Sequence, residues 1–214
     1  MVKVKICGIT REEDLDAAVQ AGADAVGFVV DVNKSPRNLS LRAARILIDR
    51  LPSNVSSVAV TIFDGFQRVV GICQELRPSF IQLHGITQKM SREHKLGLRT
   101  NTIVAVNAES PNALENAISN SEFADALLVD SNRPDGVGGT GCIHNWDLSR
   151  RIRDAIYPVP LILAGGLTPE NVSRAIRTVR PYGVDVSTGV ETRPGIKDPV
   201  KIVEFVREAK GTAF

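Results

Sequence analysis

The sequence predicts an α/β protein folded as a single (β/α)8 barrel, or TIM barrel, over residues 1–214, and three observations support this fold class. Short apolar segments alternate with amphipathic segments along the whole chain, which is typical of a parallel sheet whose strands are joined by helices. Eight such units share the 214 residues, at about 27 residues each, and this favours a closed barrel with outer helices. No linker or low-complexity stretch divides the series. The competing architecture, an open doubly wound sheet, usually has fewer strands at this length.

The eight predicted strands are short and rich in apolar residues. Residues 25–30, Ala-Val-Gly-Phe-Val-Val, have the continuous apolar character of a strand that is buried on both faces. Apolar runs bounded by polar residues or glycine place the strands at residues 2–7, 25–30, 55–63, 80–84, 102–106, 124–130, 160–164 and 182–187.

The predicted helices begin at residues that can cap a helix N-terminus. Thr10, Ser40 and Asp64 each precede a segment with helical apolar spacing. Thr168 is followed by a proline and an acid, which are the residues preferred in a first turn. Helices are therefore predicted at residues 10–22, 40–48, 64–75, 87–96, 111–118, 145–156, from 168 onward, and at 198–209.

The first strand has one apolar face and one unusual face. Because successive side chains of a strand point to opposite sides, Lys3, Lys5 and Cys7 share the second face. In a closed barrel the first strand has no free edge, so this face points inward and Cys7 stands at the C-terminal end of the strand. Taken alone, the segment could instead be an edge strand with solvated lysines and a small buried cysteine.

Polar residues also end several of the other predicted strands. His84 ends the fourth strand, Asp130 ends the sixth, and Asp185 lies in the eighth together with Ser187. The active site of a (β/α)8 barrel is built at the C-terminal ends of its strands, and ionisable groups are costly to bury there without a partner. We therefore expect these residues to converge with Cys7 at one mouth of the barrel. Structural hydrogen bonding is the alternative role for His84 and for Asp185.

Glycine-rich loops follow the last three predicted strands. A Gly-Gly-Thr-Gly stretch that includes Gly139 follows the sixth strand, Gly165-Gly166 follows the seventh, and Thr188-Gly189 follows the eighth. Glycine lets backbone amides approach a ligand closely, and the loops after strands seven and eight of such barrels often bind phosphate. The sequence therefore predicts an anion site at these loops, with phosphate as the expected anion.

Arg37 follows the second predicted strand, at the same end of the barrel. An arginine in that place can bind a carboxylate through two parallel hydrogen bonds. The alternative is an ordinary surface arginine.

Composition and residue spacing exclude several classes of function. The net charge is +2 with acids and bases interspersed and few aromatic residues, so no surface for nucleic acid is expected. No apolar run approaches the ~20 residues needed to cross a bilayer, and the N-terminus lacks a signal-peptide layout. The three cysteines and three histidines, Cys142 and His144 among them, match no metal-ligand spacing. Unpaired thiols favour the reducing cytoplasm. Both a monomer and a homodimer are compatible with the sequence.

Five motifs occur in a specific order along the chain. They are Lys5-Ile6-Cys7-Gly8-Ile9-Thr10, Gln82-Leu83-His84-Gly85, Asp130-Ser131 with the glycine-rich loop at 138–141, Ala164-Gly165-Gly166-Leu167, and Asp185-Val186-Ser187-Thr188-Gly189-Val190-Glu191. Together they resemble the phosphoribosylanthranilate isomerase family of tryptophan biosynthesis, over essentially the whole chain. Two positions depart from the family pattern: Cys142-Ile143-His144 stands where many relatives carry Lys-Thr-Phe, and Thr188 replaces a common serine.

The resemblance implies a reaction and a set of residue roles. The family rearranges N-(5-phosphoribosyl)anthranilate to 1-(2-carboxyphenylamino)-1-deoxyribulose 5-phosphate by general acid–base catalysis, with no metal or organic cofactor. The resemblance implies that Cys7 is the general base, that Asp130 is the general acid and that Arg37 holds the anthranilate carboxylate. The other implied substrate-binding residues, several of them at the phosphate, are His84, Gly139, Gly165, Gly166, Asp185, Ser187, Thr188 and Gly189.

This chemistry requires protonation states opposite to the resting tendencies of the two groups. Opening the furanose ring needs a protonated acid, and removing the C2 proton needs a base, whereas a free thiol has a pKa of ~8.5 and a free Asp ~3.9. Our hypothesis is that Lys5, on the same face as Cys7, favours the thiolate. The alternative is that Lys5 pairs with a buried acid such as Asp185.

Two other functions fit parts of the pattern. Another phosphosugar isomerase or epimerase would share the phosphate loops, but the epimerases tend to need a metal site and the related isomerase of histidine synthesis an aspartate in place of Cys7. A non-catalytic phosphosugar binder would need neither Cys7 nor Asp130.

Overall fold

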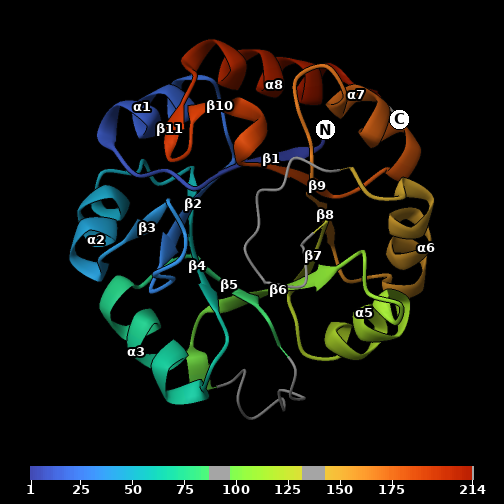
Figure 1. The fold of residues 1–214 in the computed structure, drawn as a ribbon, viewed down its shortest axis with the longest axis horizontal. Coiled ribbons are helices and arrows are strands. Elements are labelled where there is room, and N and C mark those ends of the chain that lie inside the picture. The colour runs from blue at the N-terminus through green and yellow to red at the C-terminus, as the bar shows by residue number, and fades with distance from the viewer. Residues whose placement is uncertain (87–96, 132–142, 214) are drawn as a thin grey trace.

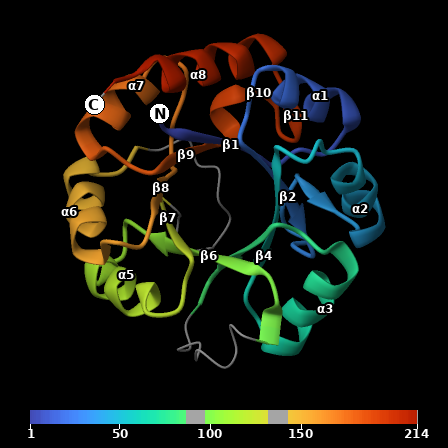
Figure 2. The same ribbon diagram turned by 180° about the vertical axis from the view of Figure 1, so that it is seen from behind.

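The computed structural model describes residues 1–86, 97–131 and 143–213, and it contains the closed barrel that the sequence predicts. One ring is formed by eight parallel strands: β1 (Lys3–Cys7), β2 (Ala25–Val30), β4 (Ser56–Ile62), β5 (Phe80–His84), β6 (Asn101–Asn107), β7 (Ala126–Asp130), β8 (Leu161–Leu163) and β9 (Gly183–Val186). β1 pairs with both β2 and β9, and these two pairings close the ring. Figure 1 and Figure 2 show the ring from its two ends.

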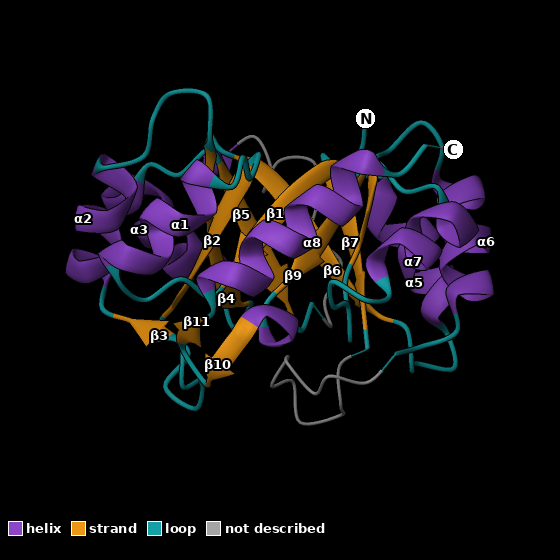
Figure 3. Ribbon diagram, turned by 90° about the horizontal axis from the view of Figure 1, so that it is seen from above, coloured by secondary structure: helices purple, strands orange, loops and turns teal. Residues whose placement is uncertain are grey.

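Helices surround the barrel on the outside, as Figure 3 shows in purple. They are α1 (Glu12–Gln20), α2 (Leu41–Asp49), α3 (Phe66–Leu76), α5 (Ala113–Ser121), α6 (Trp146–Ile156), α7 (Val172–Val179) and α8 (Pro199–Gly211). The last helix, α8, packs against both α1 and α7, so the outer layer closes at the same place as the strands. The helix predicted at residues 87–96 lies outside the described residues.

Alternation of side chains along each strand creates two apolar clusters. The larger one lies between strands and helices and includes Phe28, Leu83 and Leu127, while the smaller one fills the barrel interior around Ile103 and Leu128. Cys7 belongs to the inner cluster, which confirms that the polar face of the first strand points into the barrel.

Side chains cap the N-termini of α2 and α8, and the first of these caps was predicted from the sequence. The Ser40 hydroxyl accepts a hydrogen bond from the Ala43 amide at the start of α2. Asp198 accepts from the amides of Val200 and Lys201 at the start of α8. Side-chain caps of this kind satisfy amides that have no partner within the helix.

Three other predicted helix starts are wrong. The Thr10 hydroxyl donates to the carbonyl oxygen of Gly195 at 2.6 Å, and α1 begins after Arg11 without a side-chain cap. The Asp64 carboxylate pairs with Arg68, and α3 follows Gly65.

The third incorrect start is that of α7, which begins at Val172 and not directly after Thr168. Residues 168–171 form a turn in which Asn171 Oδ1 accepts from the Thr168 amide at 2.9 Å. Thr10 and Asp64 each have a competing side-chain partner, because short polar side chains form local and tertiary hydrogen bonds as readily as helix caps.

Four short elements that the sequence analysis did not predict lie near the C-terminal ends of the strands. They are β3 (Asn38–Leu39), the 3₁₀ helix η1 (Thr188–Val190), and β10 (Glu191–Arg193) with β11 (Ile196–Lys197), which pair as an antiparallel hairpin. Figure 3 shows β3, β10 and β11 at the end of the barrel opposite the two chain termini. Within the described ranges, no helix has the length and apolar character needed to span a membrane.

Candidate active site

One cavity of about 100 Å³ opens at the C-terminal ends of the strands. Its lining includes six residues that the sequence analysis singled out, contributed by β1, β5, β7, β9 and the loops after β2 and β9: Cys7, Arg37, His84, Asp130, Asp185 and Ser187. All six residues lie in the described ranges. The structure brings their side chains to one place, although Cys7 and Ser187 delimit a stretch of 181 residues in the sequence.

Cys7 is at the end of β1 and is only 7% exposed. It lies opposite Gly27 in the β1–β2 register. Burial raises the pKa of the thiol, while the positive charges of Lys5 and Lys197 act in the opposite direction. The thiol is thus protonated at rest, in surroundings that contain two cations able to stabilise its anion.

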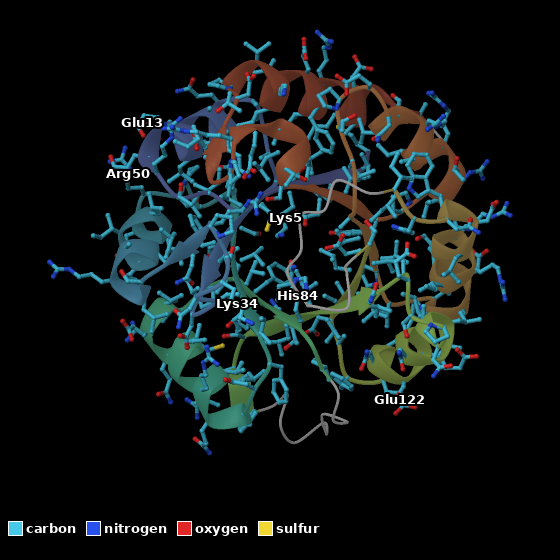
Figure 4. The ribbon with its side chains drawn as sticks, in the orientation of Figure 1. Lys5, Glu13, Lys34, Arg50, His84 and Glu122 are labelled. Carbon is cyan, nitrogen blue, oxygen red and sulfur yellow. The ribbon has the colours of Figure 1, made fainter. Side chains whose placement is uncertain are left out.

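Lys5 lies one inward position below Cys7 and forms an ion pair inside the barrel, where Figure 4 shows its side chain pointing toward the axis. Its ammonium donates to Asp185 Oδ1 at 2.9 Å, and the two side chains are 5% and 10% exposed. Burial opposes the charge on Lys5, but the carboxylate of Asp185 outweighs it and raises the pKa of the lysine. Lys5 was considered either as a group that favours the thiolate of Cys7 or as the partner of a buried acid. The structure contains the ion pair with Asp185, and the positive charge of Lys5 also acts on the thiol of Cys7.

Asp130 ends β7 and faces the same cavity. Burial raises the pKa of its carboxyl group to about 6, and the negative charge of Asp185 adds to this effect. A hydrogen bond from the backbone of Ser131 and the charge of Lys5 act in the opposite direction but are weaker. A carboxyl group with such a pKa retains its proton in part of the population near neutral pH, so it can act as an acid.

His84 ends β5 and points into the cavity mouth, as Figure 4 shows. The side-chain amide of Gln82, one inward position below, donates to His84 Nε2 at 2.8 Å. Burial lowers the pKa of the imidazole to about 4, and the charge of Lys5 adds to this shift. The ring is therefore neutral at physiological pH.

A second, smaller cavity adjoins the first between the ends of β8 and β9. It is lined by Gly165, Gly166, Ser187 and Thr188, so four of the predicted phosphate-site residues meet there. Gly165 has a φ of 82°, and a β-carbon at this position would lie 2.4 Å from Ser131 Oγ. A side chain is thus excluded on two grounds, and the backbone of this loop lies directly beside the pocket.

One further predicted residue of this anion site does not line the pocket, and another lies outside the described residues. Gly189 lies within η1 and packs against the carbonyl of Leu167, and it does not line the cavity. Gly139 lies outside the described residues, as does Cys142.

Arg37 lines the cavity but is already paired with a residue of the protein. Its Nε and Nη2 donate to the two carboxylate oxygens of Glu191 at 2.8 and 2.6 Å. Glu191 Oε1 also accepts from Lys197 Nζ at 2.8 Å, and Lys197 is 1% exposed. The sequence analysis did not assign a role to Glu191 or Lys197. A Pro-Gly pair between them was a signal for the turn of the hairpin that carries both.

His144 is buried away from both cavities, with Nε2 at 2.6 Å from Ser149 Oγ. Burial lowers its pKa to about 4. No group of three or more metal-binding side chains is present in residues 1–86, 97–131 and 143–213. A larger cavity, of about 530 Å³, opens at the N-terminal ends of the strands; Lys5 lines it, but none of the predicted catalytic or substrate-binding residues that the structure describes does.

Comparison with known proteins shows the family to which the chain belongs. The family model for N-(5'-phosphoribosyl)anthranilate (PRA) isomerase matches residues 4–208. An N-(5'-phosphoribosyl)anthranilate isomerase of Methanothrix thermoacetophila is 45% identical over 211 residues, which are 98% of this chain and 99% of the relative.

Solved structures give the same result. A phosphoribosylanthranilate isomerase in complex with reduced 1-(o-carboxyphenylamino)-1-deoxyribulose 5-phosphate is 38% identical, with a TM-score of 0.83 and coverage of 99% of this chain and 100% of the other. A structure of monomers generated from the dimeric enzyme of Thermotoga maritima is 37% identical, with the same TM-score and coverage. The chain therefore belongs to the N-(5'-phosphoribosyl)anthranilate isomerase family.

Proposed function

We propose that residues 1–214 act as one barrel domain that isomerises N-(5-phosphoribosyl)anthranilate to 1-(2-carboxyphenylamino)-1-deoxyribulose 5-phosphate, a step of tryptophan biosynthesis, in the cytoplasm. The observation that carries the proposal is the pair of groups facing one cavity. Cys7 and Asp130 both line it, and burial raises the pKa of Asp130 to about 6. One group can supply a proton and the other can accept one.

Asp130 is the general acid in this proposal. It donates its proton to the ring oxygen of the ribose, the bond between C1 and that oxygen breaks, and the lone pair of the anthranilate nitrogen forms the C1–N double bond of a Schiff base. Burial and the neighbouring charge of Asp185 raise the pKa of the carboxyl group to about 6, so part of the population carries the proton for this step near neutral pH. A positioned acid of this kind typically contributes ~10²–10⁴-fold.

Cys7 is the general base of the second step. Its thiolate removes the C2 proton, the electron pair of that C–H bond forms a C1–C2 double bond, and the nitrogen takes back its lone pair to give an enolamine. Transfer of a proton to C1 and loss of the proton on the C2 hydroxyl then give the aminoketone. The thiol is protonated at rest, so it gives up its proton to water before this step. The ammonium groups of Lys5 and Lys197 stabilise the resulting thiolate, whereas burial and the charge of Asp185 oppose it.

Binding groups lie at two sides of these reacting groups. Arg37 is proposed to hold the anthranilate carboxylate, and the pocket formed by Gly165, Gly166, Ser187 and Thr188 the phosphate. Both belong to the same end of the barrel as the acid and the base. Gly139, Gly189, His84 and Asp185 complete the proposed substrate-binding set.

The test is to add purified protein to freshly prepared phosphoribosylanthranilate and follow the loss of anthranilate fluorescence. Wild type should consume the substrate without added metal. Cys7→Ala and Asp130→Asn should each lose at least about 10²-fold in kcat while binding of the reduced product analogue persists. Full activity in both variants would show that the two roles are assigned to the wrong residues, and binding without turnover in wild type would favour the non-catalytic alternative.

The assembly is a separate proposal. A relative from Thermotoga maritima is described as dimeric, and we propose that this chain is a monomer or a homodimer. Light scattering at two protein concentrations distinguishes the two states.

A further inference from the structure

Three ionic side chains form a buried triad next to the candidate active site. Glu191 accepts both hydrogen bonds of the Arg37 fork and one from the Lys197 ammonium, at 2.8, 2.6 and 2.8 Å. The side chains of Arg37, Glu191 and Lys197 are 8%, 5% and 0% exposed. Two cations share one carboxylate, so the triad holds one positive charge in excess.

The triad adjoins the cavity through two of its members. Arg37 lines the cavity, and Lys197 Nζ donates to the carbonyl oxygen of Ser187, a residue that lines both the main cavity and the adjoining pocket, at 3.1 Å. The excess positive charge is therefore placed where an anionic substrate group would approach.

The hairpin of β10 and β11 that carries the triad is fastened to the start of the chain. The Lys197 amide donates to the buried carboxylate of Asp14 at 2.9 Å, and the Thr10 hydroxyl donates to the Gly195 carbonyl oxygen. These bonds fix the backbone in the hairpin turn at Gly195 and in β11 at Lys197. Glu191 pairs with Lys197 across the hairpin, so this strand pairing holds Glu191 beside Arg37.

The orientation of the guanidinium follows from how Glu191 binds it. Glu191 occupies the edge made by Nε and Nη2, and among the described residues none accepts a hydrogen bond from Nη1 of Arg37. A guanidinium has five donors in a planar fork, so its second edge, Nη1 with Nη2, remains able to bind another carboxylate bidentately.

We propose that Glu191 is a positioning residue that, together with Lys197, presents the second edge of Arg37 to the carboxylate of the substrate. This inference rests on the proposed function and deepens it. A buried ion cluster with an unbalanced charge is unfavourable until a counter-ion enters. The substrate carboxylate balances the charge, and an uncharged aromatic amine in its place does not.

Removal of the Glu191 charge has two opposing effects. The local charge rises from one positive unit to two, which attracts an anion more strongly. The guanidinium also loses the partner that sets its plane and turns toward water, and the buried Lys197 ammonium, left without a counter-ion, turns toward water or loses a proton. We expect the loss of orientation to dominate, because water at the open mouth screens the added charge whereas bidentate recognition depends on a fixed plane.

The experiment measures binding of two ligands by calorimetry: reduced 1-(o-carboxyphenylamino)-1-deoxyribulose 5-phosphate and its counterpart without the carboxylate. Wild type should bind the first about 10- to 100-fold more tightly, the range for a charge-assisted contact. In Glu191→Gln this preference should fall to roughly threefold or less, with the affinity for the second ligand unchanged. With phosphoribosylanthranilate as substrate, KM should rise more than kcat falls.

Controls separate positioning from loss of stability. Asp24→Asn removes a carboxylate that binds Lys3, Lys210 and a backbone amide at the other end of the barrel, and it should leave both affinities unchanged. Glu191→Asp keeps the charge but shortens the side chain, so it should not restore the preference. If Glu191→Gln fails to fold, the ratio of the two affinities in Glu191→Asp decides the question.

Two results would overturn the inference. One is a Glu191 variant that keeps the wild-type preference or binds the carboxylate ligand more tightly, which would reduce Glu191 to a neutralising charge. The other is a wild-type protein that binds both ligands equally. Failure of the proposed function is distinguishable from both, because wild type would then not turn over phosphoribosylanthranilate at all.

Discussion

Gly27 limits the space around the thiol of Cys7, so the Gly27→Ala substitution tests the proposed base by a purely steric route. A β-carbon at residue 27 would lie 2.7 Å from Cys7 Sγ and 3.2 Å from both Cys7 Cα and Lys5 Cε. Carbon and sulfur need about 3.5 Å or more at contact, so the thiol and the new methyl group must separate by about 0.8 Å.

The expected magnitudes follow from this displacement. Overpacking of a well-packed core costs ~1–3 kcal/mol of unfolding free energy, and replacement of a strand glycine by alanine returns ~0.5–1 kcal/mol. Stability should therefore fall by about 1–2 kcal/mol, which most domains survive. A reacting group misplaced by about 1 Å costs roughly 10²-fold in rate, so kcat should fall far more than stability.

The assay combines steady-state fluorescence of anthranilate with urea denaturation of the same preparation. Gly71→Ala is the matched control, because Gly71 lies in α3 and a β-carbon there meets no atom within 4 Å. This control should be about as stable as wild type or slightly more so, with unchanged kcat. If Gly27→Ala folds and keeps the wild-type kcat, the thiol does not need its present position and the steric reasoning is refuted.

Three further predictions concern charge and pH. Lys5→Met should lower turnover and raise the kinetic pKa of the base, and an unchanged pH profile would contradict a role for Lys5 at Cys7. Asp130 must be protonated to act, so its contribution to kcat/KM should be level below about pH 6 and should fall as pH rises above that value. Asp185→Asn removes a charge that raises the pKa of Asp130, so this fall should begin at a lower pH. The buried imidazole of His144 has a pKa of about 4 in the folded protein, below the value of 6.5 for an unfolded chain. Its contribution to stability is therefore complete above pH 6.5 and is lost as pH falls toward 4. Urea denaturation should show that the free energy of unfolding falls by on the order of 2 kcal/mol between pH 7 and pH 5, and this loss should be absent in His144→Gln.

The barrel could be predicted because its signals are local. Most strands are short segments rich in apolar residues, and the inward face of β1 follows from alternation once the ring is closed. The strand-end position of Cys7, Asp130 and His84 identified residues that the structure places around one cavity. Their chemical roles stay predictions until the variants are measured.

The remaining features depend on partners that are distant in sequence. Thr10 and Asp64 look like helix caps, but each has another partner, and for Thr10 this is a carbonyl 185 residues away. The pairing of Arg37 with Glu191 spans 154 residues and leaves no periodic trace in the chain. The hairpin after β9 was signalled by Pro194-Gly195, but its strands are too short to stand out as apolar runs.

The ion pairs and hydrogen bonds around the site have a consequence for folding during synthesis. Lys5 pairs with Asp185 across 180 residues, Arg37 with Glu191 across 154, and the Lys197 amide meets Asp14 across 183. Contacts of this sequence separation require the slowest loop closures of a folding chain. During synthesis the N-terminal strand emerges long before its partners. The strand that carries Lys5 and Cys7 therefore cannot form its pairing with β9, or the Lys5–Asp185 ion pair, until the last βα unit has been synthesised. The nascent enzyme therefore becomes active in a single late step, when its end docks onto its beginning.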